Sequence, residues 1–120
     1  MQANRNQEES ENDIRIENLY KKYSNGYQAI RNNSFSVKKG EIFGLLGPNG
    51  AGKSTTFNII TAALPKTSGV VKLMGRDVEN ATMGVFSEVG VCPQYDSIYE
   101  MLTTEEHMYY FARLKGLQDH

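Results

Sequence analysis

The chain contains the run Gly47-Pro48-Asn49-Gly50-Ala51-Gly52-Lys53-Ser54, which fits the phosphate-binding pattern G-x-x-x-x-G-K-[ST]. Its glycines let the backbone curl so that successive N–H groups point inward, and they place no Cβ between the chain and the phosphates. Lys53 can reach the outer phosphates, Ser54 offers a hydroxyl to Mg²⁺, and Thr55 extends the donor set by one. The run predicts a phosphate loop; the alternative is a glycine-rich turn with an accidental Lys-Ser pair.

The residues on either side of this loop favour the same interpretation. Residues 42–46 are apolar on both faces, as expected of a strand buried inside a sheet, and they lead straight into the loop. Beyond the loop, Phe57, Ile60 and Leu64 recur at helical spacing and Pro65 ends the pattern. The N-terminus of that helix would add unpaired donors and a partial positive charge to the phosphate site.

Antiparallel strands are predicted before the loop. Short alternating runs, typical of half-buried strands, lie at residues 14–16, 20–23, 27–30 and 34–37. Ser24-Asn25-Gly26 separates the second run from the third, and Asn-Gly favours a tight hairpin. The last run ends at the turn Lys39-Gly40. These patterns predict an antiparallel hairpin followed by a further strand.

Two more strands and a helix are predicted after the loop. Residues 70–74 lie between glycines and residues 89–92 are ended by Pro93, so we expect a strand at each. Thr103 and Glu106 stand at the spacing of a capping box, which begins a helix that stops at Gly116. This helix carries apolar residues on two faces, which favours either a core position or contact with a second body.

Composition excludes several classes of function. Thirteen basic and fourteen acidic residues give a net charge of −1, without the basic stripe expected of a nucleic-acid-binding protein. The longest apolar stretch, residues 42–46, is far shorter than the roughly 18 residues of a membrane helix. The polar N-terminus lacks the apolar segment of a secretory signal, and residues 1–13 are predicted to be a disordered polar linker. The single cysteine, Cys92, excludes an internal disulfide and is interpreted as a buried strand residue.

The phosphate loop alone does not select a family. A GTPase would need a downstream D-x-x-G and N-K-x-D, and neither occurs. A small-molecule kinase remains open at this point.

The sequence of residues 47–55 resembles the Walker A loop of ABC-type ATPases; it reads Gly-Pro-Asn-Gly-Ala-Gly-Lys-Ser-Thr. Lys21-Lys22-Tyr23 lies where that family places an aromatic residue that stacks on adenine. Residues 67–70 with 75–77 look like the strand pair after the loop helix, and Val89-Gly90-Val91-Cys92-Pro93-Gln94 resembles the strand leading into the Q-loop, with Gln94 as its glutamine.

Three later runs are similar to subfamily A of the ABC transporters, which consists of large eukaryotic membrane proteins, many of which move lipids. They are residues 92–96, 101–107 and 111–116. The resemblance extends from about Ile14 to Gly116. It implies an α/β fold: a P-loop NTPase (RecA-like) core with a mainly parallel sheet, an antiparallel β-subdomain and the start of an α-helical subdomain. Residues 14–120 would then be the N-terminal half of an ABC ATP-binding domain, truncated in its helical subdomain.

The resemblance also implies the roles of individual residues. Tyr23 would stack on adenine, Ser54 and Gln94 would hold Mg²⁺, and Lys53 with the loop would bind the phosphates of ATP. The implied ATP-binding loop residues are Gly47, Pro48, Asn49, Gly50, Ala51, Gly52, Lys53, Ser54 and Thr55. Two alternatives stay open, because Tyr23 can be an ordinary hairpin tyrosine and Gln94 a loop amide bonded to backbone.

Three parts of the family's catalytic site do not occur in this sequence. There is no L-S-G-G-Q signature, no apolar strand ending in Asp-Glu, and neither His107 nor His120 follows such a strand as a switch histidine. We therefore expect no complete set of catalytic residues here, with Lys53 and Gln94 as supporting groups, and an inactive fragment of an ATPase that is active as the intact parent.

By resemblance, the parent would couple ATP hydrolysis to transport across a membrane, with lipid as the expected substrate. Its partners would be a second ATP-binding domain in a head-to-tail sandwich and the membrane-spanning domain of the same transporter, with no nucleic acid. This domain would lie on the cytoplasmic face. Two rival hypotheses remain: a soluble ABC ATPase without a role in transport, and a short nucleotide-binding fragment without activity.

Overall fold

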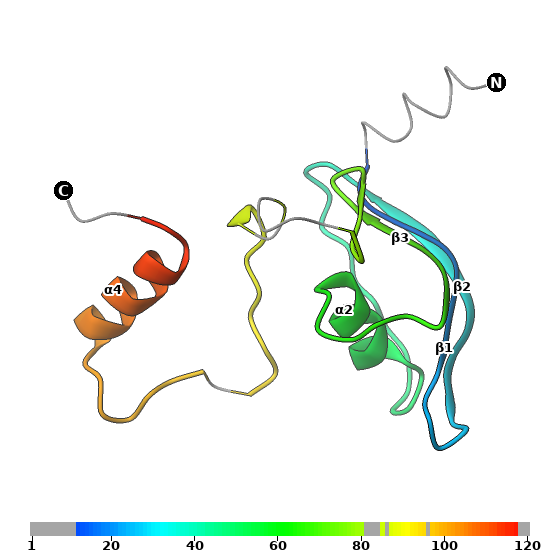
Figure 1. Ribbon diagram of the computed structural model, residues 1–120, viewed down its shortest axis with the longest axis horizontal. Helices are drawn as coiled ribbons and strands as arrows, with labels where there is room; N and C mark the ends of the chain where they lie inside the picture. The colour runs from blue at the N-terminus through cyan, green and yellow to red at the C-terminus, as the bar shows by residue number, and fades with distance from the viewer. Residues whose placement is uncertain (1–11, 81–84, 86, 96, 118–120) are drawn as a thin grey trace. The chain divides into compact units, whose positions relative to one another are not determined.

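The computed structural model describes residues 12–80, 85, 87–95 and 97–117, and these fall into two units divided after residue 86 (Figure 1). The first eleven residues of the predicted linker, 1–11, lie outside the described residues. Asn12 and Asp13 were assigned to that linker, but they belong to the first strand. Their backbone groups are part of a sheet ladder, which the polar composition of the segment did not reveal.

A four-stranded sheet forms the first unit, in the order β2-β1-β3-β4 (Figure 1). The strands are β1 (Asn12–Lys22), β2 (Gln28–Lys38), β3 (Ser68–Leu73) and β4 (Arg76–Asp77). All three pairings are antiparallel, as predicted for the β-subdomain. The two alternating runs expected at residues 27–30 and 34–37 belong to one strand, β2.

The hairpin predicted at Ser24-Asn25-Gly26 joins β1 to β2. Tyr23 N donates to Tyr27 O and Gly26 N donates to Tyr23 O, each at 2.9 Å. Asn25 Oδ1 accepts a bond from Tyr27 N at 3.0 Å, and Gly26 has a φ of 87°. This is the left-handed conformation that glycine adopts without strain, so the prediction is confirmed for its stated reason.

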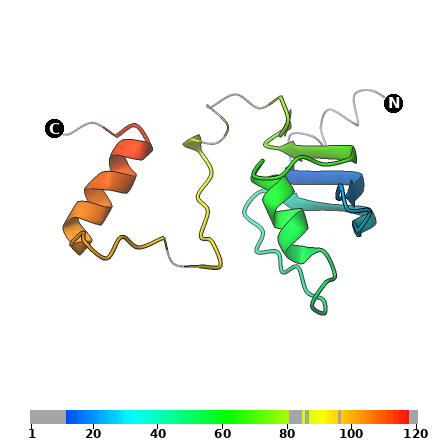
Figure 2. The same ribbon diagram turned by 60° about the horizontal axis from the view of Figure 1, so that its bottom comes forward.

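Helix α2 (Lys53–Ile60) lies against one face of the sheet (Figure 2). It buries Thr56 and Ile59, whereas the predicted apolar face ran through Phe57, Ile60 and Leu64. That prediction is wrong in two respects: the helix ends at Ile60, before Leu64, and Phe57 is exposed. Gly52, at the start of the helix, lies close to the backbone of β2. The apolar core also contains Ile16, Leu19, Ala29, Ile30, Val37, Val71, Leu73, Val78 and Val85.

Residues 42–46 do not form the buried strand that their composition predicts. They adopt no regular structure, and the side chains of Ile42 and Leu46 are 100% and 91% exposed. A strand is held by hydrogen bonds to a neighbour, and within the described residues no strand pairs with this segment. The mainly parallel sheet expected for the core is accordingly not formed by these residues.

The strand predicted at residues 89–92 is not formed either, for the same reason. These residues lie in the second unit, where the structure assigns no strand to any residue it describes. Cys92 is exposed, so its interpretation as a buried strand residue is wrong.

The second unit contains helix α4 (Thr104–Leu114), and both of its predicted ends are confirmed. Glu106 N donates to Thr103 Oγ1 at 3.3 Å, while Glu106 Oε2 accepts from Thr103 N at 2.7 Å, which completes the capping box. At the other end, Leu117 N donates to Ala112 O at 3.0 Å around Gly116, whose φ is 81°. No residue of α4 is buried. Neither α4 nor any other helix in the described ranges is long and apolar enough to cross a membrane.

Candidate functional site

The glycines of residues 47–52 bend the backbone immediately before α2. Ala51 N donates to Pro48 O at 3.2 Å, which closes a turn inside the loop. Gly50 and Gly52 have φ values of 83° and 88°, a conformation that other residues adopt only with strain. Gly52 is the N-cap of α2, and its carbonyl accepts the first helical bond from Thr56 N at 2.8 Å. The predicted loop is thus a curled segment that ends in a helix.

Gly52 also lies in close contact with β2. A Cβ at this position would come within 2.5 Å of the carbonyl oxygen of Ala29 and 3.1 Å of Cγ1 of Ile30. Real Cβ atoms do not approach a backbone oxygen so closely, so only glycine allows the loop to pack here. The sheet therefore fixes the position at which α2 begins.

The N-terminus of α2 is open to an anionic ligand. Its N-cap makes no side-chain hydrogen bond, and its first turn contains no acidic residue. The first N–H groups of a helix have no acceptor within the helix and carry a partial positive charge. Ser54 is exposed on this turn and Thr55 is half-buried. The arrangement suits a phosphate group.

The side chain of Lys53 folds back over the loop. Its Nζ donates to the carbonyl oxygens of Gly47 and Pro48, at 2.7 Å each. The ammonium is therefore held beside the loop and the helix N-terminus. A phosphate bound there would compete with these two carbonyls for the ammonium.

Tyr23, predicted to stack on adenine, lies beside the first turn of α2. Its hydroxyl is 3.4 Å from Thr55 Oγ1, which places the hairpin next to the phosphate loop. Its ring stacks on Tyr27 with centroids 6.2 Å apart and planes inclined by 21°. Nζ of Lys21 lies 5.3 Å from the Tyr23 ring centroid. The structure thus brings Tyr23, Thr55 and the loop together.

Sequence reasoning missed Tyr27. Its hydroxyl donates to Gly50 O of the loop at 3.4 Å. The residues on either side of a tight hairpin turn lie opposite one another. Tyr23 and Tyr27 flank the turn Ser24-Asn25-Gly26, so their positions in the sequence could have indicated that they pair.

Gln94 is exposed and belongs to the second unit, so its place in the site stays a prediction. Nor do the described residues contain a group of three or more His, Cys, Asp or Glu side chains that could hold a metal by themselves.

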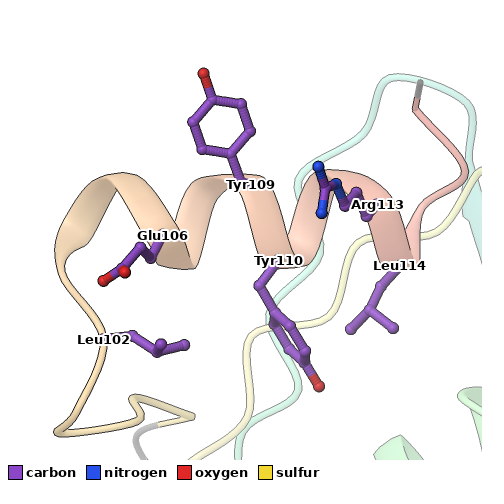
Figure 3. A pocket seen from close by; sticks show the side chains of 6 residues that line it. All are labelled: Leu102, Glu106, Tyr109, Tyr110, Arg113 and Leu114. Carbon is purple, nitrogen blue, oxygen red and sulfur yellow. The ribbon is translucent and has the colours of Figure 1, made fainter. Parts of the chain in front are cut away.

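A hollow of about 540 Å³ runs along α4 in the second unit (Figure 3). Its lining consists of Leu102, Glu106, Tyr109, Tyr110, Arg113 and Leu114. The backbone and hydroxyl of Thr103 hold the pKa of Glu106 below its ordinary value, because both donate to its carboxylate. A hydrogen bond with Tyr99 raises the pKa of Tyr110. Glu106 is thus bonded to the residue that caps the helix, and Tyr110 to the segment that precedes it.

His107 has a structural role in the same unit. Its Nε2 accepts from Tyr99 N at 2.8 Å, and its Nδ1 lies 3.0 Å from Thr103 O. A ring nitrogen that accepts a backbone bond leaves the other as the donor, so both nitrogens are used in fixing the segment before α4.

Comparison with known families gives a match over most of the chain. The family model described as "ABC transporter" matches residues 30–120. The chain is 46% identical over 90 residues to "ABC transporter A family member 7" of Arabidopsis thaliana, which covers 75% of this chain and 10% of that protein. It is 37% identical over 105 residues to "Phospholipid-transporting ATPase ABCA7" of Homo sapiens, covering 87% of this chain and 5% of that protein.

A solved structure of an ABC transporter subunit is similar to this chain. "Structure of ATP binding subunit of ABC transporter" matches with a TM-score of 0.77 and 28% sequence identity, over 88% of this chain and 44% of that one. The chain spans a tenth or less of the length of the two curated relatives.

Proposed function

The chain belongs to the ABC transporter family, and from that premise we propose that its first unit binds ATP between the phosphate loop and Tyr23. One observation carries this proposal. The N-terminus of α2 has no side-chain cap and no acidic residue in its first turn, and the ammonium of Lys53 lies beside it, bonded to two backbone carbonyls for which a phosphate can compete. Residues 47–55 and α2 supply the donors, and Tyr23 supplies an aromatic face near Thr55 for the base.

Magnesium fits the donors on this chain. Ser54 presents a hydroxyl oxygen on the exposed first turn of α2, and Gln94 presents an amide oxygen. Oxygen ligands of this kind suit Mg²⁺, which also binds the phosphates directly and neutralises part of their charge. In this proposal the hydroxyl of Ser54 and the amide oxygen of Gln94 would be magnesium ligands.

For the longer protein we infer ATP hydrolysis coupled to transport across a membrane, with lipid as the substrate class. The names of the curated relatives, a phospholipid-transporting ATPase among them, support this inference. Its partners would be a second ATP-binding domain, facing this one head to tail, and a membrane-spanning domain, with this part on the cytoplasmic face. The 120 residues by themselves bind nucleotide without hydrolysing it, because the sequence has no L-S-G-G-Q run and no Asp-Glu pair after an apolar strand.

The decisive experiment compares Mg-ATP binding by the full chain and by Lys53→Ala. We expect at least a roughly tenfold loss of affinity, since a charge-assisted contact to phosphate is removed. Lys39→Ala is the matched control: it deletes an exposed lysine of the same charge from the turn after β2 and should leave affinity unchanged. Equal titration curves for Lys53→Ala and the unaltered chain would refute the assignment of the loop.

A further inference from the structure

Tyr27 makes one contact within the hairpin and one with the phosphate loop. Its ring stacks on Tyr23, and its hydroxyl donates to the carbonyl of Gly50 inside the loop. We propose that Tyr27 is a positioning residue for the base: it holds the ring of Tyr23 at the angle and height at which a nucleobase can stack. This inference rests on the proposed ATP site and adds to it a residue with no assigned role.

The turn makes the ring pair rigid. Tyr23 N donates to Tyr27 O at 2.9 Å across the hairpin, and Tyr27 N donates to Asn25 Oδ1 at 3.0 Å. Their Cα atoms are therefore fixed relative to one another before any ligand arrives. Rings at 6.2 Å and 21° fall within the range in which aromatic pairs attract each other. Each ring thus restricts the rotamers of the other.

The two tyrosines reach different parts of the phosphate site. The Tyr23 hydroxyl lies 3.4 Å from Thr55 Oγ1 on the first turn of α2, whereas the Tyr27 hydroxyl bonds to Gly50 O, also at 3.4 Å. Figure 1 shows the hairpin turn and the loop before α2 near each other at one end of the first unit. The hairpin therefore contacts both the loop and the helix, and the two tyrosines that make these contacts stack on one another.

Lys21 supports Tyr23 independently of Tyr27. Its side chain is buried, its Nζ donates to Pro65 O at 2.5 Å, and the same ammonium lies 5.3 Å from the Tyr23 ring centroid. An ammonium near an aromatic face attracts the ring. Because this anchor remains when Tyr27 is altered, removal of Tyr27 should loosen Tyr23 without unfolding the hairpin.

The test separates base binding from phosphate binding. ATP and inorganic tripolyphosphate are titrated into the full chain and into Tyr27→Leu and Tyr27→Phe. Tripolyphosphate has no base, so a residue that acts through Tyr23 affects ATP alone. For Tyr27→Leu we expect a loss of about threefold to tenfold in ATP affinity, the range of an aromatic pair, and a change below about twofold for tripolyphosphate. Tyr27→Phe keeps the ring and should keep ATP affinity within about twofold. Tyr109→Leu, from a tyrosine of α4 that is 53% exposed against 52% for Tyr27, should change neither affinity.

Three results would overturn the inference. Unchanged ATP affinity in Tyr27→Leu would show that Tyr27 does not position the ring of Tyr23 for base binding. An equal loss of ATP and tripolyphosphate affinity would show a general structural role. A Tyr27→Phe chain as weak as Tyr27→Leu would assign the effect to the hydroxyl rather than to the stacked ring. Tyr23→Ala and Lys53→Ala are titrated in parallel to distinguish these results from failure of the proposed ATP site. If Tyr23→Ala binds ATP normally, the base stacks elsewhere. If Lys53→Ala binds ATP normally, the assignment of the phosphate loop fails.

Discussion

Gly52 at the start of α2 lies against Ala29 of β2 so closely that a Cβ on the glycine would come within 2.5 Å of the Ala29 carbonyl oxygen. The start of α2 therefore lies against the backbone of β2 at a position that only glycine allows. Thr56 and Ile59 are the residues of this helix that are buried.

Replacing Gly52 with alanine should destabilise the first unit, because both the φ of 88° and the contact with β2 become unfavourable. We expect a loss of roughly 1–3 kcal/mol in the free energy of unfolding, measured by urea titration. Gly50→Ala is the matched control: its φ is 83°, but a Cβ there meets nothing within 4 Å. If the two variants lose the same stability, the contact with Ala29 contributes nothing.

Base recognition at Tyr23 should tolerate different bases, since every base offers a π-face. We expect ATP and GTP to bind within roughly tenfold of each other. Tyr23→Ala should weaken both by about 1–3 kcal/mol, whereas Tyr23→Trp should retain binding. Calorimetric titration of the three chains with both nucleotides measures this. A strong preference for one base in the unaltered chain would contradict stacking as the main contact.

Glu106 should make the start of α4 sensitive to acid. Hydrogen bonds from Thr103 lower its pKa in the folded chain, so the capping box is fully present above the unfolded pKa of about 4.3. It is lost as the pH falls through the lower, folded pKa. The amide resonance of Thr103, followed by NMR as the pH is reduced, should move in that window. In Glu106→Gln, whose amide cannot titrate, the Thr103 amide resonance should not move over the same pH range. An identical response in this variant and in the unaltered chain would exclude Glu106 as the cause.

The 120 residues alone should turn over ATP no faster than Lys53→Ala. The loop can hold phosphates, but the sequence offers no carboxylate after an apolar strand to position the attacking water. Phosphate release from Mg-ATP, assayed on both chains at equal concentration, measures this. Hydrolysis that depends on Lys53 would show that the chain contains a complete catalytic site.

Residues 42–46 should cause self-association, because large apolar side chains are exposed there and no strand among the described residues pairs with the segment. Replacing both Ile42 and Leu46 with serine should lower the apparent mass in light scattering at high concentration. Met101→Ser, at a side chain that is 93% exposed in the second unit, serves as the control and should have a smaller effect. Unchanged self-association after the double replacement would show that another surface causes it.

Local chemistry made some elements predictable from the sequence. Asn25-Gly26 specified the hairpin, Thr103 and Glu106 specified the start of α4, and Gly116 its end, because each depends on bonds between residues close in sequence. The phosphate loop was predictable for the same reason. Tyr23 lies beside Thr55, and its predicted stacking on adenine remains a prediction.

Pairing between distant segments was not predictable in this way. The apolar residues 42–46 and 89–92 indicate a tendency to be buried, but a strand forms only where another strand supplies hydrogen-bond partners. The buried face of α2 was misassigned, because the spacing of Phe57 and Ile60 does not show that the helix starts against β2 at Gly52 and buries Thr56 and Ile59. Tyr27 has no motif of its own, and its place against Tyr23 follows from the sequence only if the hairpin is taken as closed.

The bonds from Lys53 to the carbonyls of Gly47 and Pro48 make nucleotide entry an exchange reaction. The incoming phosphate gains an ammonium donor only as two backbone acceptors lose theirs, so the net gain is smaller than the strength of the ion contact itself. The same bonds hold the empty loop in its curled form. Lys53→Ala should therefore change the protein both with and without nucleotide. With nucleotide it lacks a contact to phosphate, and without nucleotide its loop is freer to rearrange. Nucleotide should bind this variant more slowly as well as more weakly. The ligand must then order the loop, which Lys53 otherwise holds in its curled form.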